Sequence, residues 1–257
     1  VRKAFMYSEN PINEEGEFKD WFNNKDGHVR FIHIDLGLKR DRSALSMVHC
    51  AGFKEVKTSM GVETLPVVNV DLIHSWQAKP GEEINFSSVR QMIVDLCRKY
   101  DVGLVTFDRW QSVEMIQSLK AQGINANFHS VKKTDYDTLM TTIYDTRLRG
   151  YWIELLVEEE LLKLRLFNNN KIDHPNSGSK DLADALAGSV FNCIQNMVMD
   201  TEVDIEIIGT DREYEYDEDM PEFGSTQLYN GSTKELSLMD QKSSISADDI
   251  EGWLETL

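Results

Sequence analysis

The 257-residue sequence contains no run of eighteen apolar residues, and its first residues include no hydrophobic segment typical of a signal peptide. We therefore expect neither a membrane-spanning nor a secreted protein, and we expect a cytoplasmic setting. Its three cysteines, Cys50, Cys97 and Cys193, lie far apart and form no CxxC pair. This spacing argues against a zinc knuckle and against a disulfide framework, so reduced cysteines in the core are expected.

Motifs of several large enzyme classes are also missing. No GxxxxGK[ST] loop is present, and no GxGxxG follows a strand pattern. The sequence therefore encodes neither a nucleotide-driven motor nor a dinucleotide-dependent enzyme. HExxH and GxSxG do not occur either.

The net charge of −17 is concentrated near the C-terminus. Residues 201–257 carry 16 acidic and 3 basic side chains, which leaves a net charge of only −4 for residues 1–200. We predict a linker remnant at 1–27, a folded domain at 28–199 and an acidic tail at 200–257, either solvated or docked on a partner.

Apolar periodicity predicts three successive strands followed by alternating helices and strands. The expected elements are strands 29–36, 43–50 and 66–76, helix 86–100, strand 102–107, helix 110–122, strand 124–131, helix 134–149, helix 154–168, strand 171–174 and helix 180–198. Three strands without intervening helices indicate an antiparallel meander. The whole order predicts an α/β fold, a mixed sheet flanked by helices of the ribonuclease-H-like (resolvase/integrase) type.

Four aspartates lie where these elements begin or end. Asp35 interrupts an apolar strand, and Asp108 follows the strand VGLVTF. Asp181 and Asp184 share one face in the first turn of the last helix. Taken singly, each has an ordinary interpretation, as a strand-end residue, a helix N-cap or a partner of the helix dipole.

The coincidence of the four aspartates favours a metal site. A carboxylate in an apolar strand loses several kcal/mol of solvation unless a cation compensates it. Oxygen ligands without histidine or cysteine at ligand spacing suit Mg²⁺ or Mn²⁺ better than zinc.

Three stretches of the sequence carry a family resemblance. They are HIDLGL at 33–38 with Asp41, FDRWQS at 107–112, and DHP at 173–175 continuing to GSKDLADALAG at 178–188. In this order and at this separation they resemble the nuclease domain of the large terminase subunit of tailed bacteriophages.

The resemblance implies an endonuclease that cuts concatemeric double-stranded viral DNA during genome packaging. Asp35, Asp108 and Asp181 match the catalytic, metal-binding triad of the family, and Asp184 matches a further acidic position near the metals. The implied cofactors are two divalent ions, Mg²⁺ or Mn²⁺, about 4 Å apart, one activating water and the other stabilising the leaving 3′ oxygen. Asp35 is expected to bridge both ions.

DNA contacts are expected from basic residues near these motifs. The candidates are Lys39, Arg40, Arg42, Arg109 and Lys180. A domain with a net charge of −4 has no general surplus of positive charge, and no zinc finger or helix-turn-helix pattern occurs, so we expect sequence-independent and salt-sensitive binding of double-stranded DNA.

Further partners follow from the resemblance alone. They are the phage portal or procapsid, the packaging ATPase domain and the small terminase subunit, in the cytoplasm of the infected bacterial host and without a membrane. The ATPase domain of the family is missing from this sequence, so either the chain is a fragment or the two activities lie on separate polypeptides. We favour a fragment.

Two alternatives remain open at this point. Another ribonuclease-H-like enzyme, such as a Holliday-junction resolvase or an integrase, would use a similar acidic cluster on a different DNA substrate. A non-catalytic docking module of a packaging motor would use the acidic tail instead.

Overall fold

The computed structural model describes residues 1–13, 17–23, 26–37, 42–59, 61–79, 81–108, 112–167, 171–174 and 179–200. The predicted acidic tail beyond residue 200 lies outside these ranges. Within them, no helix has the length and apolar character needed to cross a bilayer.

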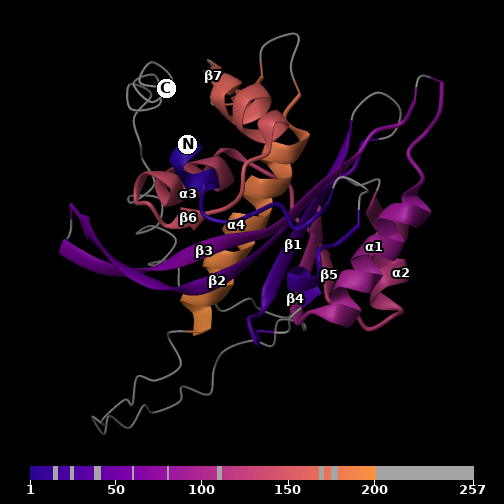
Figure 1. Ribbon diagram of the computed structural model, residues 1–257, viewed down its shortest axis with the longest axis horizontal. Helices are drawn as coiled ribbons and strands as arrows, with labels where there is room; N and C mark the ends of the chain where they lie inside the picture. Colours follow the sequence, from indigo (N-terminus) through magenta and orange to yellow (C-terminus); the bar gives the residue numbers. More distant parts are fainter. Residues whose placement is uncertain are drawn as a thin grey trace, which may run out of the picture.

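Six strands form one mixed sheet in the order β5-β4-β1-β2-β3-β6 (Figure 1). The strands are β1 (Arg30–Asp35), β2 (Ser43–Thr58), β3 (Gly61–Trp76), β4 (Val102–Phe107), β5 (Ala126–Phe128) and β6 (Leu148–Arg149). β1, β2 and β3 are antiparallel, whereas β4 and β5 are parallel to β1, and β6 is parallel to β3. The predicted meander and mixed sheet are confirmed.

In the described ranges, four α-helices and several shorter turns surround the sheet. They are α1 (Phe86–Lys99), α2 (Val113–Lys120), α3 (Lys133–Tyr144), α4 (Asp181–Asp200), the π-helical turn η4 (Leu155–Glu160) and the 3-10 turns η1 (Arg2–Phe5), η2 (Asp20–Asn23) and η5 (Leu161–Lys163). A small separate hairpin pairs β7 (Arg165–Phe167) with β8 (Lys171–Asp173).

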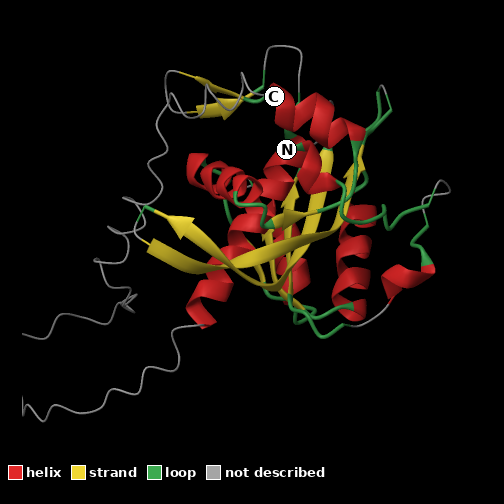
Figure 2. Cartoon of the chain, turned by 60° about the vertical axis from the view of Figure 1, so that its left-hand side comes forward, coloured by secondary structure: helices red, strands yellow, loops and turns green. Residues whose placement is uncertain are grey.

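Several elements differ from the sequence prediction. β2 and β3 continue beyond the sheet as a two-stranded ribbon (Figure 2), because their polar outer halves hydrogen-bond each other and need no buried face. The helix expected at 134–149 ends at Tyr144, and Thr146 adopts a positive φ of 54°, which turns the chain into β6. The helix expected at 154–168 is instead the π-helical turn η4, then η5 and β7.

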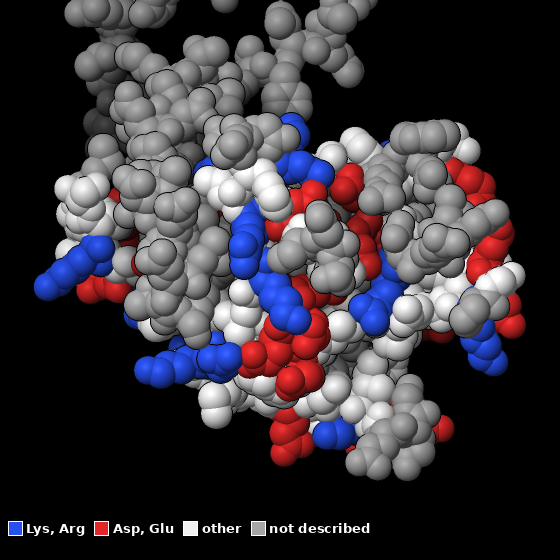
Figure 3. Space-filling view, turned by 90° about the horizontal axis from the view of Figure 1, so that it is seen from above, with Lys and Arg blue, Asp and Glu red and all other residues white. Residues whose placement is uncertain are grey.

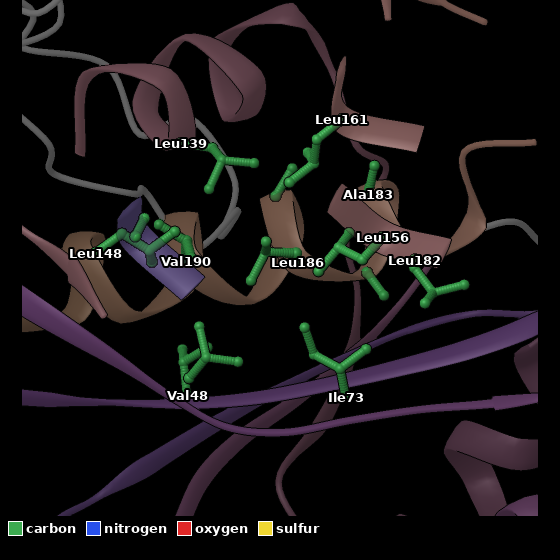
Figure 4. Close-up of a cluster of buried hydrophobic side chains, with 14 of the residues drawn as sticks. Val48, Ile73, Leu139, Leu148, Leu156, Leu161, Leu182, Ala183, Leu186 and Val190 are labelled. Atoms are coloured by element: carbon green, nitrogen blue, oxygen red, sulfur yellow. The ribbon is translucent and has the colours of Figure 1, made fainter. Parts of the chain in front are cut away.

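The sheet separates two apolar cores. One lies under α1 and α2, and the other lies between the sheet and the layer formed by α4, α3 and η4. Figure 4 shows α4 enclosed on both sides, with Val48 and Ile73 of the sheet facing it from one side and Leu139 and Leu161 from the other. Alternation along each strand therefore decides which side chains face α4.

α4 lies unusually close to β1 at its middle. A Cβ atom on Gly188 would come within 2.5 Å of the His33 ring, so only glycine permits this contact. His33 is fully buried, hydrogen-bonds Thr106 of β4 through Nδ1 at 2.7 Å, and has a pKa lowered to about 3 by burial. The neutral imidazole thus forms part of the packing between the sheet and α4.

Part of the N-terminal segment, predicted as a linker remnant, packs on this domain. The Phe5 side chain of η1 is fully buried, and the Gly150 amide donates a 2.7 Å hydrogen bond to the Ala4 carbonyl.

Candidate functional site

The ends of β1 and β4 bring the first two aspartates side by side. The strands are parallel neighbours with Ile34 opposite Phe107, and the Asp108 amide donates to the Ile34 carbonyl at 3.1 Å. Ile34 and Phe107 belong to the core under α1 and α2, so by alternation Asp35 and the residue after Phe107 lie toward α4. Asp35 is only 3% exposed.

The first turn of α4 supplies Asp184. This residue is 5% exposed, and its carboxylate accepts the Tyr136 hydroxyl at 2.6 Å and pairs with the Lys180 ammonium at 2.7 Å. Burial raises the pKa of Asp184; Lys180 and Tyr136 oppose this rise, and the negative charge of Asp108 adds to it. That repulsion indicates that Asp108 and Asp184 are electrostatic neighbours although they lie on different elements.

Tyr136 of α3 connects Asp184 with β1. Burial raises the pKa of its phenol well above the ordinary value, and the charges of Asp184, Glu160 and Asp35 raise it further. Since the phenol stays protonated, its hydroxyl donates to Asp184 and fixes the orientation of that carboxylate.

Asp181 lies one turn earlier on α4, beside the loop that precedes β2. Its Oδ2 atom accepts the Arg42 amide at 3.2 Å and the Ser179 hydroxyl at 2.7 Å. These contacts hold the carboxylate of Asp181 beside Arg42, the residue directly before β2.

Glu160 is a fifth acidic residue of this cluster, and we did not predict it. It lies at the end of η4, is 1% exposed, and accepts the Ala183 amide of α4 at 2.8 Å. Burial raises its pKa to about 7, and the negative charge of Asp181 contributes to the rise. A signal was present: Glu160 stands four residues after Leu156 and four before Leu164, on the apolar face of that segment.

The basic candidates are only partly described. Lys180 lies in the cluster, bound to Asp184, and the charge of Arg42 acts on Glu160. Lys39, Arg40 and Arg109, predicted to contact DNA, lie outside the described residues. The motif residue Asp41 lies outside them as well.

Figure 3 views the molecule from above Figure 1, the side on which α4 begins. Asp and Glu side chains gather near the middle of this face, and Lys and Arg side chains lie beside them. The acidic residues described above come from the ends of β1 and β4, the start of α4 and the end of η4. We name them the aspartate cluster: Asp35, Asp108, Asp181 and Asp184, with Glu160.

The donor set of the aspartate cluster consists of carboxylate oxygens, which suit hard divalent ions. In the described part of the chain, the three metal-ligating side chains found within 4.8 Å of one another lie outside this cluster, at Asp26, His28 and His49.

Comparison of the sequence with known proteins gives a distant match. No model of a known protein family matches the sequence. The uncharacterized protein MJ0330 of Methanocaldococcus jannaschii is 26% identical over 181 residues, a match that covers 65% of this chain but only 30% of that protein.

Solved structures that share the fold include nuclease domains of phage large terminases. The large terminase nuclease domain of Thermus phage P74-26 aligns with a TM-score of 0.50 and 16% identity, covering 73% of this chain and 90% of that one. The large terminase nuclease of thermophilic phage G20c, solved with bound magnesium, aligns with a TM-score of 0.52 and 16% identity, covering 74% and 93%. The predicted ribonuclease-H-like fold and its resemblance to terminase nuclease domains are thereby confirmed.

Proposed function

We propose that this chain is a metal-dependent endonuclease of the large terminase type, which cuts concatemeric double-stranded viral DNA during genome packaging. The observation that supports this most directly is the convergence of acidic side chains from β1, β4 and α4 at one end of the sheet. The fold, shared with terminase nuclease domains, agrees with it.

In this proposal Asp35, Asp108 and Asp181 are the catalytic residues, and with Asp184 they hold two divalent ions, Mg²⁺ or Mn²⁺. The residues fit such ions because their donors are oxygens and their negative charge exceeds the positive charge of Lys180 beside them. When bound, the ions supply an activated water and stabilise the leaving 3′ oxygen.

The surrounding residues orient the ligands before any substrate arrives. The Tyr136 hydroxyl and Lys180 hold Asp184, while Ser179 and the Arg42 amide hold Asp181. Such preorganisation lowers the cost of arranging several like charges around one phosphate.

Binding of DNA is proposed to be independent of sequence. Arg42 and Lys180 lie at the aspartate cluster, and Lys39, Arg40 and Arg109 are proposed to reach the backbone on either side of it. With few cations available, binding by this chain should weaken steeply with added salt. We further propose that the protein acts in the cytoplasm of the infected bacterial host, at the procapsid portal, together with a packaging ATPase domain and a small terminase subunit.

Plasmid digestion tests the proposal. The parent chain should nick or linearise plasmid with Mn²⁺ or Mg²⁺ but not with Ca²⁺ or chelator, and Asp35→Asn and Asp108→Asn should each lose more than about a hundredfold in rate. Asp101→Asn is the matched control. Asp101 is exposed and directly precedes β4, at the end of that strand opposite to Asp108. Cutting that survives in chelator, or an Asp101→Asn loss as large as the others, would contradict the mechanism.

The DNA substrate separates a terminase-type nuclease from a junction resolvase. A panel of linear, nicked and four-way DNA should be cut without preference for the branched form. Strong preference for a four-way junction would contradict the packaging role and indicate a junction resolvase. It would not contradict metal-dependent cutting at the aspartate cluster.

A further inference from the structure

A second group of metal-ligating side chains lies at the opposite end of the sheet. Asp26 and His28 belong to the loop before β1, and His49 belongs to β2; one ligand atom from each lies within 4.8 Å of the others. The His28 and His49 rings are stacked with centroids 4.6 Å apart. We name Asp26, His28 and His49 the histidine cluster.

The histidine cluster is separate from the aspartate cluster. In the pairing of β1 with β2, Arg30 lies opposite His49, whereas Asp35 lies opposite Ala44. Five residues of extended strand span roughly 16 Å at about 3.3 Å per residue. One ion cannot serve both clusters.

His49 is held as metal-binding histidines commonly are. Its Nδ1 atom lies 2.8 Å and 2.9 Å from the two carboxylate oxygens of Asp71 on β3. A carboxylate can only accept, so Nδ1 carries the proton and Nε2 keeps its lone pair for a ligand. A carboxylate behind a ligating imidazole fixes the tautomer and raises the basicity of the ligand atom.

Asp26 is held just as firmly. Its oxygens accept Arg30 Nη1 at 2.9 Å, Arg30 Nη2 at 2.7 Å and the His28 amide at 3.0 Å. The same Arg30 also lies 3.4 Å from Asp71 through Nε. Arg30 thereby holds Asp26 by hydrogen bonds and lies within ion-pair distance of Asp71, and its positive charge moderates the affinity of the cluster for a cation.

Beside the histidine cluster is a cavity of about 360 Å³, whose wall includes Asp26, Arg30 and Asp71. Three buried polar atoms of residues lining it, Arg30 Nε, Asn69 Oδ1 and the Tyr100 hydroxyl, have no hydrogen-bond partner among the described residues. Buried polar atoms of this kind are normally satisfied by water. The cavity therefore has room for the waters that would complete the coordination of an ion held by three protein ligands.

From this geometry we propose that Asp26, His28 and His49 bind one divalent transition-metal ion of the Zn²⁺, Co²⁺ or Ni²⁺ class. Two imidazole nitrogens and one carboxylate suit these ions and not Mg²⁺, which prefers oxygen ligands. The ion fastens the loop before β1 to β2. Its role is structural, in contrast to the ions proposed for the aspartate cluster. This proposal does not depend on the proposed nuclease activity.

Cobalt titration tests the proposal on the full chain carrying Asp35→Asn and Asp108→Asn, which weakens metal binding at the aspartate cluster. Co²⁺ with nitrogen ligands at low coordination number absorbs visible light far more strongly than Co²⁺ in an all-oxygen octahedral site. We expect one equivalent of Co²⁺ to produce this absorption and one equivalent of Zn²⁺ to remove it.

Two variants and one control assign the ion. His28→Gln and Asp26→Asn, added to that chain, should each weaken Co²⁺ binding at least tenfold, whereas His74→Gln, which changes a histidine of β3 outside the cluster, should leave it unchanged. Circular dichroism of the metal-free variants confirms that they are folded. No absorption in the parent, or equal absorption in all variants, would overturn the site.

Activity provides an independent check. In the otherwise unchanged chain, His28→Gln should keep its rate of plasmid digestion in Mg²⁺. Loss of digestion together with unchanged Co²⁺ binding would also overturn the proposal, because the residue would then serve the aspartate cluster and not a second ion.

Discussion

Carboxylates near the two ends of β1 have pKa values that are shifted in opposite directions. At the beginning of the strand, the hydrogen bonds from Arg30 hold the pKa of Asp26 well below its usual value. At the other end, burial raises the pKa of Asp184, and the charge of Asp108 raises it further. Both residues are aspartates that accept hydrogen bonds from a basic side chain, so the chemistry of the residue does not explain the difference.

The explanation is the balance of charge around each group. Arg30 lies among two carboxylates and a stacked Tyr100 ring, which together offset the loss of its hydration. At the aspartate cluster five acidic side chains meet with Lys180 and Arg42 nearby, and the excess negative charge destabilises the folded state. The surroundings of Arg30 neutralise most of their own charge, whereas the aspartate cluster keeps an excess of negative charge that divalent ions could neutralise.

Removing the guanidinium group of Arg30, at the beginning of β1, should have the largest effect on stability. Arg30→Met leaves Asp26 and Asp71 without their shared partner in a buried position, and we expect the free energy of unfolding to fall by about 3 kcal/mol. Urea unfolding followed by circular dichroism measures it.

The matched change at the other end should behave differently. In Asp184→Asn the amide oxygen can still accept the Tyr136 hydroxyl, and one negative charge of the crowded cluster is removed. We expect its unfolding free energy to stay within about 1 kcal/mol of the parent. Equal losses for the two variants would mean that the two ends of the strand do not differ in charge balance.

An effect somewhat smaller than that of Arg30→Met is expected where α4 crosses β1 between the two ends of the strand. Gly188→Ala places a methyl group against the His33 ring, so α4 must move away from the sheet, at a cost of about 2 to 3 kcal/mol. The displacement carries Asp184 away from Asp35 and Asp108, so metal-dependent digestion should fall while Co²⁺ binding at the histidine cluster persists.

The same prediction has an internal control. Adding His33→Ala should relieve the clash, and the double variant should be more stable than the sum of the two single changes predicts. Strictly additive losses would show that the imidazole is not what keeps residue 188 a glycine.

Much of the aspartate cluster was predictable because its parts are local. An aspartate that breaks an apolar strand, or follows one, is visible in the sequence, and the parallel order of β1 and β4 then sets Asp35 and Asp108 side by side. The mixed sheet and the meander followed from the same periodicity.

The remaining parts depend on contacts that no local pattern fixes. Glu160 enters the cluster only because η4 is a π-helical turn packed against the start of α4, where a regular helix was expected. Tyr136 reads as an ordinary apolar position of α3. The histidine cluster joins residues 26 and 28 with residue 49, and its support by Asp71 depends on the register of three strands. A shift of one residue in that register would turn these side chains to the other face.

The charge of Glu160 can be isolated by the pH dependence of stability. Its pKa is raised from 4.5 to about 7, mainly by burial. Between about pH 4.5 and pH 7 the folded protein therefore holds a proton that the unfolded chain has released, so the free energy of unfolding falls as pH rises through this window. Glu160→Gln keeps an oxygen for the Ala183 amide but cannot ionise.

In chelator, Glu160→Gln should match the parent near pH 4.5 and exceed it in stability by about 3 kcal/mol at pH 8, as urea unfolding at several pH values measures. Millimolar Mg²⁺ should narrow this gap, because bound cations offset the repulsion between Glu160 and Asp181 that the variant removes. The beginning of β1 supplies the contrast: Arg30→Met should lose the same stability with and without Mg²⁺, since oxygen-seeking ions have no site there. A stability difference between Glu160→Gln and the parent that changes with neither pH nor Mg²⁺ would show that the acidic end of the sheet carries no excess negative charge. It would also show that the carboxylates there are not available to a metal ion.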